Sequence, residues 1–311
     1  MEIINENTIL NPNDSFVATV GFFDGLHLGH RYLIKELKSI ARSENRKTLV
    51  ISFETHPRKV LQPDFEPALL STNDEKLEHI SNLGVDACLL LAFNVEMSRL
   101  TALDFLRDVL YNKYNVRTLL VGHDHRFGHN RAEGFDDYSR YGNAMGLNVV
   151  KAKRFSTADH QFISSSDVRT AINHGDITKA NALLGYNYSF SGIVNSGFQV
   201  GRKIGFPTAN IALLSTEKLI PATGVYHVNA YVEGVCHLGM MNIGNRPTFS
   251  NDIAKSVEVN IFDFEDNIYN KIIRVEIIRK IRDEIKFETV DALIAQLHND
   301  KKNVLDSLSL K

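Results

Sequence analysis

The chain has 311 residues, a formal net charge of −2 at pH 7, 43% hydrophobic residues and two cysteines. This length suggests about two domains with buried cores, and the absence of a basic block argues against a dedicated nucleic-acid surface. Widely spaced Cys88 and Cys236, a polar N-terminus and short apolar runs exclude a disulfide framework, a signal peptide and a membrane span, so a soluble cytoplasmic protein is expected.

The first half of the chain alternates apolar strands with amphipathic helices. Strands are expected at residues 17–22, 47–53, 85–93, 117–122 and 147–152. Apolar residues at helical spacing predict helices around 33–41, 73–82 and 101–114, the last two beginning near Asn73 and Thr101. Pro57 is expected to stop regular structure after the second strand. This alternation predicts an α/β domain with a parallel sheet and right-handed crossovers.

The first strand runs into a glycine-rich turn with two histidines. His27, Gly29 and His30 should lie where this strand passes to a helix N-terminus, and the backbone N–H groups and helix dipole there suit a phosphate. Gly29 lets a ligand approach the backbone. Two imidazoles three residues apart can donate hydrogen bonds to phosphate oxygens. A surface loop with solvated histidines, or a metal-binding histidine pair, is the alternative.

Polar side chains also follow the second and fourth strands. His56 and Arg58 come just beyond a strand end, where open α/β sheets bind ligands. The loop after the fourth strand contains His123, His125 and His129, which suggest either a metal cluster or an ordinary solvated loop.

A run of three hydroxyl residues, Ser164, Ser165 and Ser166, is expected at the start of another helix. Such hydroxyls can cap the helix and bind phosphate, and Arg169 one turn later can hold a leaving pyrophosphate. An ordinary N-cap with a solvated arginine is the alternative. The helical pattern continues to about Leu184.

After residue 186 the apolar residues alternate as in strands. Strands are expected at 226–232, 235–240, 257–261 and 273–277, with Glu233 and Gly234 as a two-residue turn. This pattern predicts an antiparallel sheet that closes into a small barrel, followed by a helix near residues 289–299.

One stretch of this second region is rich in glycine, with four glycines between residues 192 and 205. Such a loop can wrap its N–H groups around an anion. Thr208 and Asn210 follow it and offer two oxygen ligands for Mg²⁺ held with nucleotide phosphates. Glu258 lies in a strand whose apolar face is formed by 257, 259 and 261, so its carboxylate points away from that face. A solvent-facing glutamate is the simpler alternative.

These segments resemble known signatures. His27-Leu-Gly-His30 resembles the His-x-Gly-His motif of the nucleotidylyl transferase superfamily, and the longer stretch from Gly21 resembles the N-terminal module of bacterial bifunctional riboflavin kinase/FAD synthetases. Segments 121–134, 163–169 and 205–210 are similar to further motifs of that family, and the resemblance covers roughly residues 15–305. His125 replaces a usual aromatic residue, and Asn260 stands where histidine is frequent.

The resemblance implies a fold and a reaction sequence. Residues 1–186 should form a Rossmann-like FMN adenylyltransferase (FAD synthetase) domain, and 187–311 a riboflavin kinase barrel with a terminal helix. ATP would phosphorylate riboflavin to FMN, and a second ATP would give FAD and pyrophosphate, with Mg²⁺ as cofactor. Neither nucleic acid nor a membrane is expected as a partner, and self-association stays open. A kinase with a degenerate adenylyltransferase domain, and a non-catalytic flavin or nucleotide sensor, are the alternatives.

The resemblance also implies roles for individual residues. The catalytic residues would be His27, His30, Arg169 and Glu258, the last as the base for the ribityl hydroxyl. ATP and its phosphates would be bound by Gly21, Phe23, Asp24, Gly29, Ser164, Ser165, Ser166, Gly197, Gly201 and Gly205. The flavin would be bound by His56, Arg58, Asp124, Phe127 and Arg282, and the metal by Thr208 and Asn210.

Overall fold

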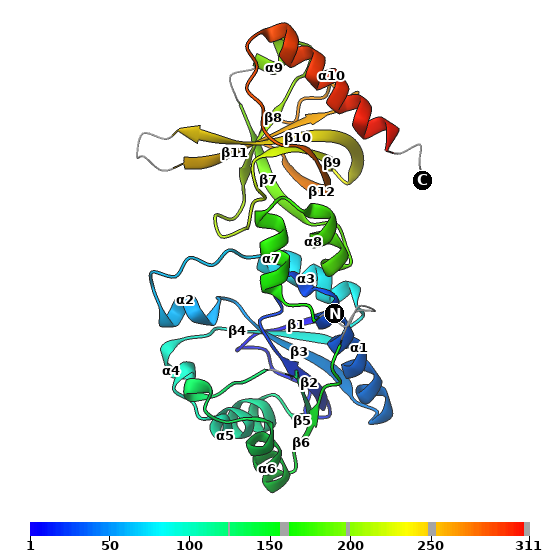
Figure 1. Cartoon of the computed structure of the whole chain (residues 1–311). Helices are drawn as coiled ribbons and strands as arrows, with labels where there is room; N and C mark the ends of the chain where they lie inside the picture. The colour runs from blue at the N-terminus through cyan, green and yellow to red at the C-terminus, as the bar shows by residue number, and fades with distance from the viewer. Residues whose placement is uncertain (124, 156–161, 197–199, 248–252, 308–311) are drawn as a thin grey trace. The chain divides into compact units, whose positions relative to one another are not determined.

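The computed structural model describes all residues except 124, 156–161, 197–199, 248–252 and 308–311 (Figure 1). Contacts within the chain divide it into two compact units, Met1–Ser164 and Ser165–Lys311. None of the helices in the described ranges combines the length and the apolarity that a bilayer crossing requires.

The first unit is built on a six-stranded sheet in which neighbouring strands are parallel. In chain order the strands are β1 (Glu2–Ile4), β2 (Phe16–Val20), β3 (Lys47–Phe53), β4 (Ala87–Leu91), β5 (Val116–Val121) and β6 (Asn148–Lys151). Their spatial order is β1-β4-β3-β2-β5-β6. From β2 the chain therefore adds β3 and β4 on one side of this strand, and then returns to add β5 on its other side. In open α/β sheets, ligands bind beyond the carboxyl ends of the strands at such a reversal.

Helices cover both faces of this sheet. They are η1 (Asp24–Leu26), α1 (Leu28–Ser43), α2 (Pro57–Leu61), α3 (Asn73–Asn82), α4 (Val95–Ser98), α5 (Ala102–Asp104), the π-helix η2 (Phe105–Lys113), η3 (His129–Arg131) and α6 (Phe135–Met145). On one face, Ile34 and Leu37 of α1 and Ile80 of α3 pack with Val17 and Val50 of the strands.

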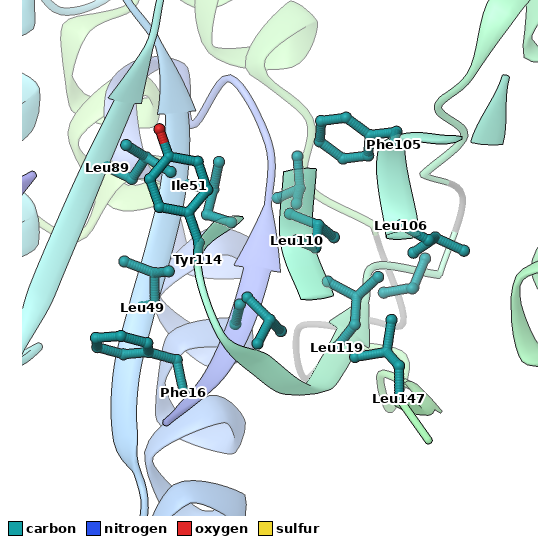
Figure 2. Close-up of a cluster of buried hydrophobic side chains, with 14 of the residues drawn as sticks. Phe16, Leu49, Ile51, Leu89, Phe105, Leu106, Leu110, Tyr114, Leu119 and Leu147 are labelled. Atoms are coloured by element: carbon teal, nitrogen blue, oxygen red, sulfur yellow. The ribbon is translucent and has the colours of Figure 1, made fainter. Parts of the chain in front are cut away.

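The other face carries the larger apolar cluster, which is covered by η2 and α6. Figure 2 shows Phe16, Leu49 and Leu89 of the strands in the same cluster as Phe105 and Leu110 of η2. Because both faces are covered, every residue of β2 is buried, as its uninterrupted apolar sequence predicts.

The second unit contains a closed antiparallel barrel with the strand order β10-β11-β8-β7-β12-β9. Its strands are β7 (Ser189–Asn195), β8 (Ala209–Leu213), β9 (Gly224–Val232), β10 (Val235–Pro247), β11 (Ile253–Ile261) and β12 (Ile272–Arg282), and its helices are α7 (Ser165–Asn173), α8 (Ile177–Leu184), α9 (Val200–Lys203) and α10 (Val290–Asp306). Val304 of α10 packs with Phe206, Met240 and Phe262, so the terminal helix contributes to the barrel's apolar core.

The structure confirms the predicted fold class: a parallel α/β sheet, a small closed antiparallel barrel and a terminal helix. The expected hairpin turn is also present, with φ of 50° at Glu233 and 85° at Gly234, which is typical of a two-residue turn between β9 and β10.

Several local expectations were wrong. Pro57 begins α2 as its first residue, because proline at that position loses no helical hydrogen bond. The N-cap of α3 is Thr72 rather than Asn73, in a reciprocal capping box with Glu75. The helical pattern that was expected to continue to Leu184 is interrupted at Gly175, whose φ of 75° separates α7 from α8.

Candidate active sites

The first candidate site lies where β2 leads through η1 into α1. His27 is the N-cap of α1, and the first hydrogen bond of this helix runs from the Arg31 N–H to the His27 carbonyl at 3.0 Å. The N–H groups of residues 28–30 therefore have no acceptor within the helix. With the positive end of the helix dipole, they form the environment that a phosphate requires.

The two predicted catalytic histidines are packed against each other at this helix end. The His27 and His30 rings are stacked with centroids 3.7 Å apart, and His27 is 5% exposed. A Cβ atom on Gly29 would lie 3.1 Å from the His27 ring, so this glycine makes room for the imidazole. Phe23 meets the His30 ring edge-on at 5.2 Å, and a Cβ on Gly21 would lie 3.0 Å from the Phe23 ring. Gly21, Phe23 and Gly29 thus keep the histidine pair in place.

Burial holds the pKa of His30 well below its ordinary value, and the charges of His27 and His125 lower this pKa further. His30 is therefore neutral at pH 7 and keeps one N–H donor. Its Nδ1 atom is buried and makes no hydrogen bond to any described residue. A buried ring nitrogen of this kind, beside a helix N-terminus, suits a polar ligand. Within the described ranges, no group of three or more His, Cys, Asp or Glu side chains is arranged to hold a metal ion.

Asp24, expected to bind ATP, bonds to the backbone before α3. Its carboxylate accepts the N–H groups of Leu70 at 2.9 Å and Ser71 at 3.0 Å. The Ser71 hydroxyl in turn accepts the Gly25 N–H at 3.1 Å. These bonds give Asp24 a structural role in holding η1, and its contact with ATP stays a prediction.

A cavity of about 600 Å³ lies beyond the carboxyl ends of β2, β3, β4 and β5. Its wall brings together three of the predicted flavin-binding residues, His56, Arg58 and Phe127. Phe22, Phe53, Phe93 and Phe105 add further aromatic side chains to this wall. Such a volume and lining suit a planar ring system of drug size. Asp124 and Gly197, predicted to bind flavin and phosphate, lie outside the described residues.

Phe127 is held in this wall by a tyrosine for which the sequence suggested no role. The Tyr138 ring of α6 stacks on the Phe127 ring with centroids 4.1 Å apart. The Tyr138 hydroxyl also bonds both the N–H and the carbonyl of Phe127, each at 3.0 Å. The signal that could have identified Tyr138 is its place on the buried face of an amphipathic helix, but no helix was expected there.

The hydroxyl run falls at a helix start, as expected. Ser164 precedes α7, Ser165 and Ser166 open it, and Arg169 lies about one turn further on. Ser165, Ser166 and Arg169 belong to the second unit, whereas Ser164 ends the first. Their contact with the nucleotide phosphates stays a prediction.

The second candidate site lies in the barrel, around one carboxylate. β11 lies between β8 and β10, and Glu258 is paired in register with Asn210 on one side and Asn242 on the other. The Thr208 hydroxyl donates a hydrogen bond to Glu258 Oε2 at 3.2 Å. Three residues that were predicted from separate segments, Thr208, Asn210 and Glu258, therefore lie together. Hydroxyl, amide and carboxylate oxygens are the ligands that Mg²⁺ prefers, so this donor set fits the expected metal.

The segment before Thr208 folds back tightly on itself. The Phe206 N–H donates to the Gly201 carbonyl at 2.8 Å, and a Cβ on Gly201 would lie 2.2 Å from the Phe206 carbonyl oxygen. Gly205 has a φ of +81°, which glycine adopts without strain. Asn260 Nδ2 donates to the Pro207 carbonyl at 2.7 Å and fixes the end of the turn. Gly201 and Gly205 thus shape the turn, and their contact with ATP stays a prediction.

Arg282, expected to contact flavin, joins β12 to α10. Its Nε donates to both carboxylate oxygens of Asp300, at 3.1 and 3.0 Å, and Asp300 is fully buried. Gln296 Nε2 donates to the same carboxylate at 2.8 Å. These contacts favour a structural role for Arg282, and its role in flavin binding is untested.

Two residues near Glu258 received no role from the sequence. A Cβ built on Gly244 would lie 3.1 Å from Glu284 Oε1 and 3.4 Å from Asn242 Nδ2, so both polar groups approach the same point of β10. Asn242 is also the register partner of Glu258. Their segments matched the family in sequence, but strand register was needed to place Asn242 beside Glu258.

Comparisons with known proteins match both units. The family model described as FAD synthetase matches residues 10–167, and the one described as riboflavin kinase matches residues 184–308. A solved structure from Streptococcus pneumoniae, described as a macrolide-efflux protein, is similar with a TM-score of 0.88 at 30% identity, and the match covers 97% of this chain and 98% of that one.

Curated relatives match over nearly the whole chain. Proteins from Listeria monocytogenes (37% identity, covering 92% of this chain and 90% of the relative), Escherichia coli (36%, 93% and 92%) and Bacillus subtilis (36%, 93% and 91%) are each named bifunctional riboflavin kinase/FMN adenylyltransferase. With both family models in the same order along the sequence, the chain belongs to the family of bifunctional riboflavin kinase/FMN adenylyltransferases.

Proposed function

We propose that each activity of this bifunctional enzyme resides in one of the two predicted domains, the adenylyltransferase in residues 1–186 and the kinase in residues 187–311. The barrel phosphorylates riboflavin with ATP to give FMN, and the α/β unit transfers AMP from a second ATP to FMN to give FAD and pyrophosphate. The positions of the two family models support this division. The observation that carries this proposal is the Glu258 carboxylate, which accepts a hydrogen bond from the Thr208 hydroxyl in the barrel. A carboxylate base serves a reaction, whereas a protein that only binds its ligand needs none. The comparisons do not favour the two alternatives, which were a kinase with a degenerate adenylyltransferase domain and a non-catalytic flavin or nucleotide sensor.

In the kinase unit, Glu258 accepts the proton of the primary ribityl hydroxyl as this oxygen attacks the γ-phosphate of ATP, and the bond from the γ-phosphorus to the bridging oxygen breaks to release ADP. The bond from Thr208 orients the carboxylate. Thr208 and Asn210 would hold Mg²⁺, which neutralises charge on the phosphates. The glycine-rich segment with Gly201 and Gly205 comes directly before these ligands in the sequence and would contact the phosphate chain.

In the adenylyltransferase unit, the FMN ring occupies the aromatic cavity at His56, Arg58 and Phe127. The α1 N-terminus with His27 and His30 binds the ATP phosphates and stabilises the charge that develops as the FMN phosphate attacks the α-phosphate. That phosphate is already ionised, so this step needs positioning and donors but no base. Ser164–Ser166 and Arg169 fall within the predicted adenylyltransferase domain, residues 1–186, and their hydroxyl and guanidinium groups suit a pyrophosphate.

The setting of the enzyme is also part of the proposal. A near-neutral net charge and free cysteines support a cytoplasmic enzyme that takes riboflavin, FMN and ATP and has no nucleic-acid partner. Dependence on Mg²⁺ rests on the oxygen donors around Glu258.

Thr208→Ala is expected to raise the Mg²⁺ concentration for half-maximal kinase activity by roughly 10–100-fold, the range seen when a group supporting a metal site is removed. The reason is the loss of one hard oxygen ligand. The measurement is FMN formation against Mg²⁺ concentration at fixed ATP. Thr208→Ser keeps the hydroxyl and should behave like wild type, and an unchanged Mg²⁺ dependence in Thr208→Ala would remove this residue from the metal site.

A fragment of residues 187–311 is expected to make FMN from riboflavin and no FAD, because the proposed functional boundary lies between residues 186 and 187. A fragment of 165–311 should do the same with a higher Tm. It retains the Asn181 Nδ2 bond to the Ile277 carbonyl at 2.9 Å and the Tyr188 N–H bond to Asn181 Oδ1 at 2.8 Å. It also keeps the fully buried Leu184 side chain.

Chromatography of the flavin products and thermal melts of both fragments check this division. A shorter fragment that folds but makes no FMN, beside an active 165–311, would move the functional boundary to the N-terminal side of α8. Two folded and inactive fragments would contradict the assignment of the kinase to the barrel.

A further inference from the structure

Lys76 of α3 is a buried cation for which the mechanism above has no use. The residue is 1% exposed, although lysine side chains are almost never fully buried unless they are paired. Its Nζ donates to Ser52 Oγ at 3.2 Å and to the Phe53 carbonyl at 3.1 Å, both at the carboxyl end of β3. The ammonium group therefore supports the end of a strand that reaches the aromatic cavity.

The same ammonium group also reaches the chain beyond β2. Nζ lies 4.3 Å from the centroid of the Phe22 ring, a cation–π distance, and Ser52 Oγ donates to the Phe22 carbonyl at 3.1 Å. The Phe22 ring meets the His56 ring edge-on at 4.7 Å. Phe22, Phe53 and His56 all line the cavity. One buried charge thus contacts the Phe22 ring and the Phe53 carbonyl directly, and the Phe22 ring in turn contacts His56.

Lys76 stays charged at pH 7 although its burial disfavours the charged form. Burial lowers the pKa of Lys76 to about 8, whereas Asp24 of η1 and Cys88 of β4 act in the opposite direction. Burial raises the pKa of the Cys88 thiol to about 12, so this thiol is neutral across the physiological range. Lys76 is therefore mostly charged at pH 7 and loses its proton as the pH rises through 8.

This pKa has a consequence for stability. The ordinary lysine pKa of 10.5 applies to the unfolded chain, so the unfolded state binds more protons between about pH 8 and 10.5. Stability contributed by this group then rises with pH over that window, which means that the buried charge itself disfavours the folded state. A charge retained at such a position is more typical of functional sites than of structural ones.

We propose that Lys76 is a positioning residue for FMN: its ammonium group fixes the ends of β2 and β3 so that Phe22, Phe53 and His56 form the wall against which the flavin ring packs. This inference rests on the proposed assignment of the cavity to FMN. A neutral amine makes weaker hydrogen bonds and no cation–π contact, so FMN binding weakens when Lys76 loses its proton.

The test uses the full-length chain with Lys76→Met and Lys76→Arg. FAD formation is measured against FMN concentration at saturating ATP between pH 7 and 9. Lys76→Met should raise the KM for FMN about tenfold at pH 7, as loss of one charged contact does, with a smaller change in kcat. In wild type the KM should rise above pH 8, and Lys76→Arg should flatten this rise because arginine stays charged.

Two readouts separate positioning from folding. FMN formation by the second unit of the same protein should be unchanged in both variants, and Lys76→Met should not lower the Tm, because it removes a buried charge. A lowered Tm with an unchanged KM for FMN would overturn the proposal, and so would a wild-type KM that stays flat up to pH 9.

Phe127→Ala tests the cavity assignment separately, because this side chain lines the cavity and is held there by stacking on Tyr138 of α6. If Phe127→Ala raises the KM for FMN and Lys76→Met does not, the inference about Lys76 alone is wrong. If neither variant changes it, FMN binds elsewhere, and both the cavity assignment and the role of Lys76 fall.

Discussion

Glu258→Gln should reduce FMN formation from riboflavin by about 10²–10⁴-fold, the contribution that a positioned general base typically makes. A primary hydroxyl is a poor nucleophile at neutral pH, and glutamine cannot accept its proton. Glutamine keeps the size of the side chain and can still accept the hydrogen bond from Thr208, so folding should change little. FAD formation from supplied FMN should continue at the wild-type rate, because that reaction uses an ionised phosphate.

Glu276→Gln provides a matched control in the same barrel. Glu276 is also a half-buried strand glutamate, and its carboxylate contacts the Tyr231 hydroxyl at 3.2 Å and Arg274 at 3.0 Å. Kinase activity of this variant should remain within about twofold of wild type, since it lies outside the proposed site. Full kinase activity in Glu258→Gln would instead make Glu258 an ordinary strand residue, and the base would have to be sought elsewhere in the barrel.

The parts of the fold that were predictable are those with a strong local pattern. β3 has the bounds that were expected, Lys47–Phe53, and α3 ends at the expected Asn82, although its N-cap lies one residue before the expected one. β1 is only three residues long at the edge of the sheet, too short for a periodic pattern to indicate a strand. α6 begins at a glycine N-cap, where a helix start is usually marked by Ser, Thr, Asp or Asn.

The candidate sites also differ in how far the local sequence predicts them. The helix end at His27 and His30 could be placed from consecutive residues, since a strand, a turn and a helix follow one another there. The pairing of Glu258 with Asn210 depends on strand register, which local periodicity does not supply; the family resemblance implied a role for each residue but not their pairing. The bond between Arg282 and Asp300 joins two elements, and no pattern in either element predicts it.

Lys76 is a candidate functional residue that was not predicted from the sequence. A lysine in a helix is usually solvated, so no role was predicted for Lys76. The available signal was its spacing: Lys76 lies four residues before the buried Ile80, on the face of α3 that packs against the sheet. A charged residue on an apolar face identifies a candidate, but only the strand ends that it contacts show which cavity it serves.

His27→Ala and His30→Ala should each reduce FAD formation from FMN by about 10²–10³-fold, the loss that follows removal of one positioned donor to a developing charge. FMN formation should be unaffected, because the barrel carries that reaction. The measurement is initial rates of both activities on the same preparation, with pyrophosphate release as a second readout for the adenylyl transfer. His174→Ala, which removes an exposed histidine after α7, should leave both rates unchanged.

The stacked geometry makes a sharper prediction for the double variant. Since the two rings pack at 3.7 Å and act on the same phosphates, removing both should cost little more than removing one, as for groups that work as a unit. The low pKa of His30 keeps it neutral, so wild-type FAD formation should show no loss between pH 6.5 and 8 from deprotonation of this residue. Equal losses of FMN and FAD formation in the single variants, with a lowered Tm, would mean that these histidines hold the fold together instead of serving the reaction.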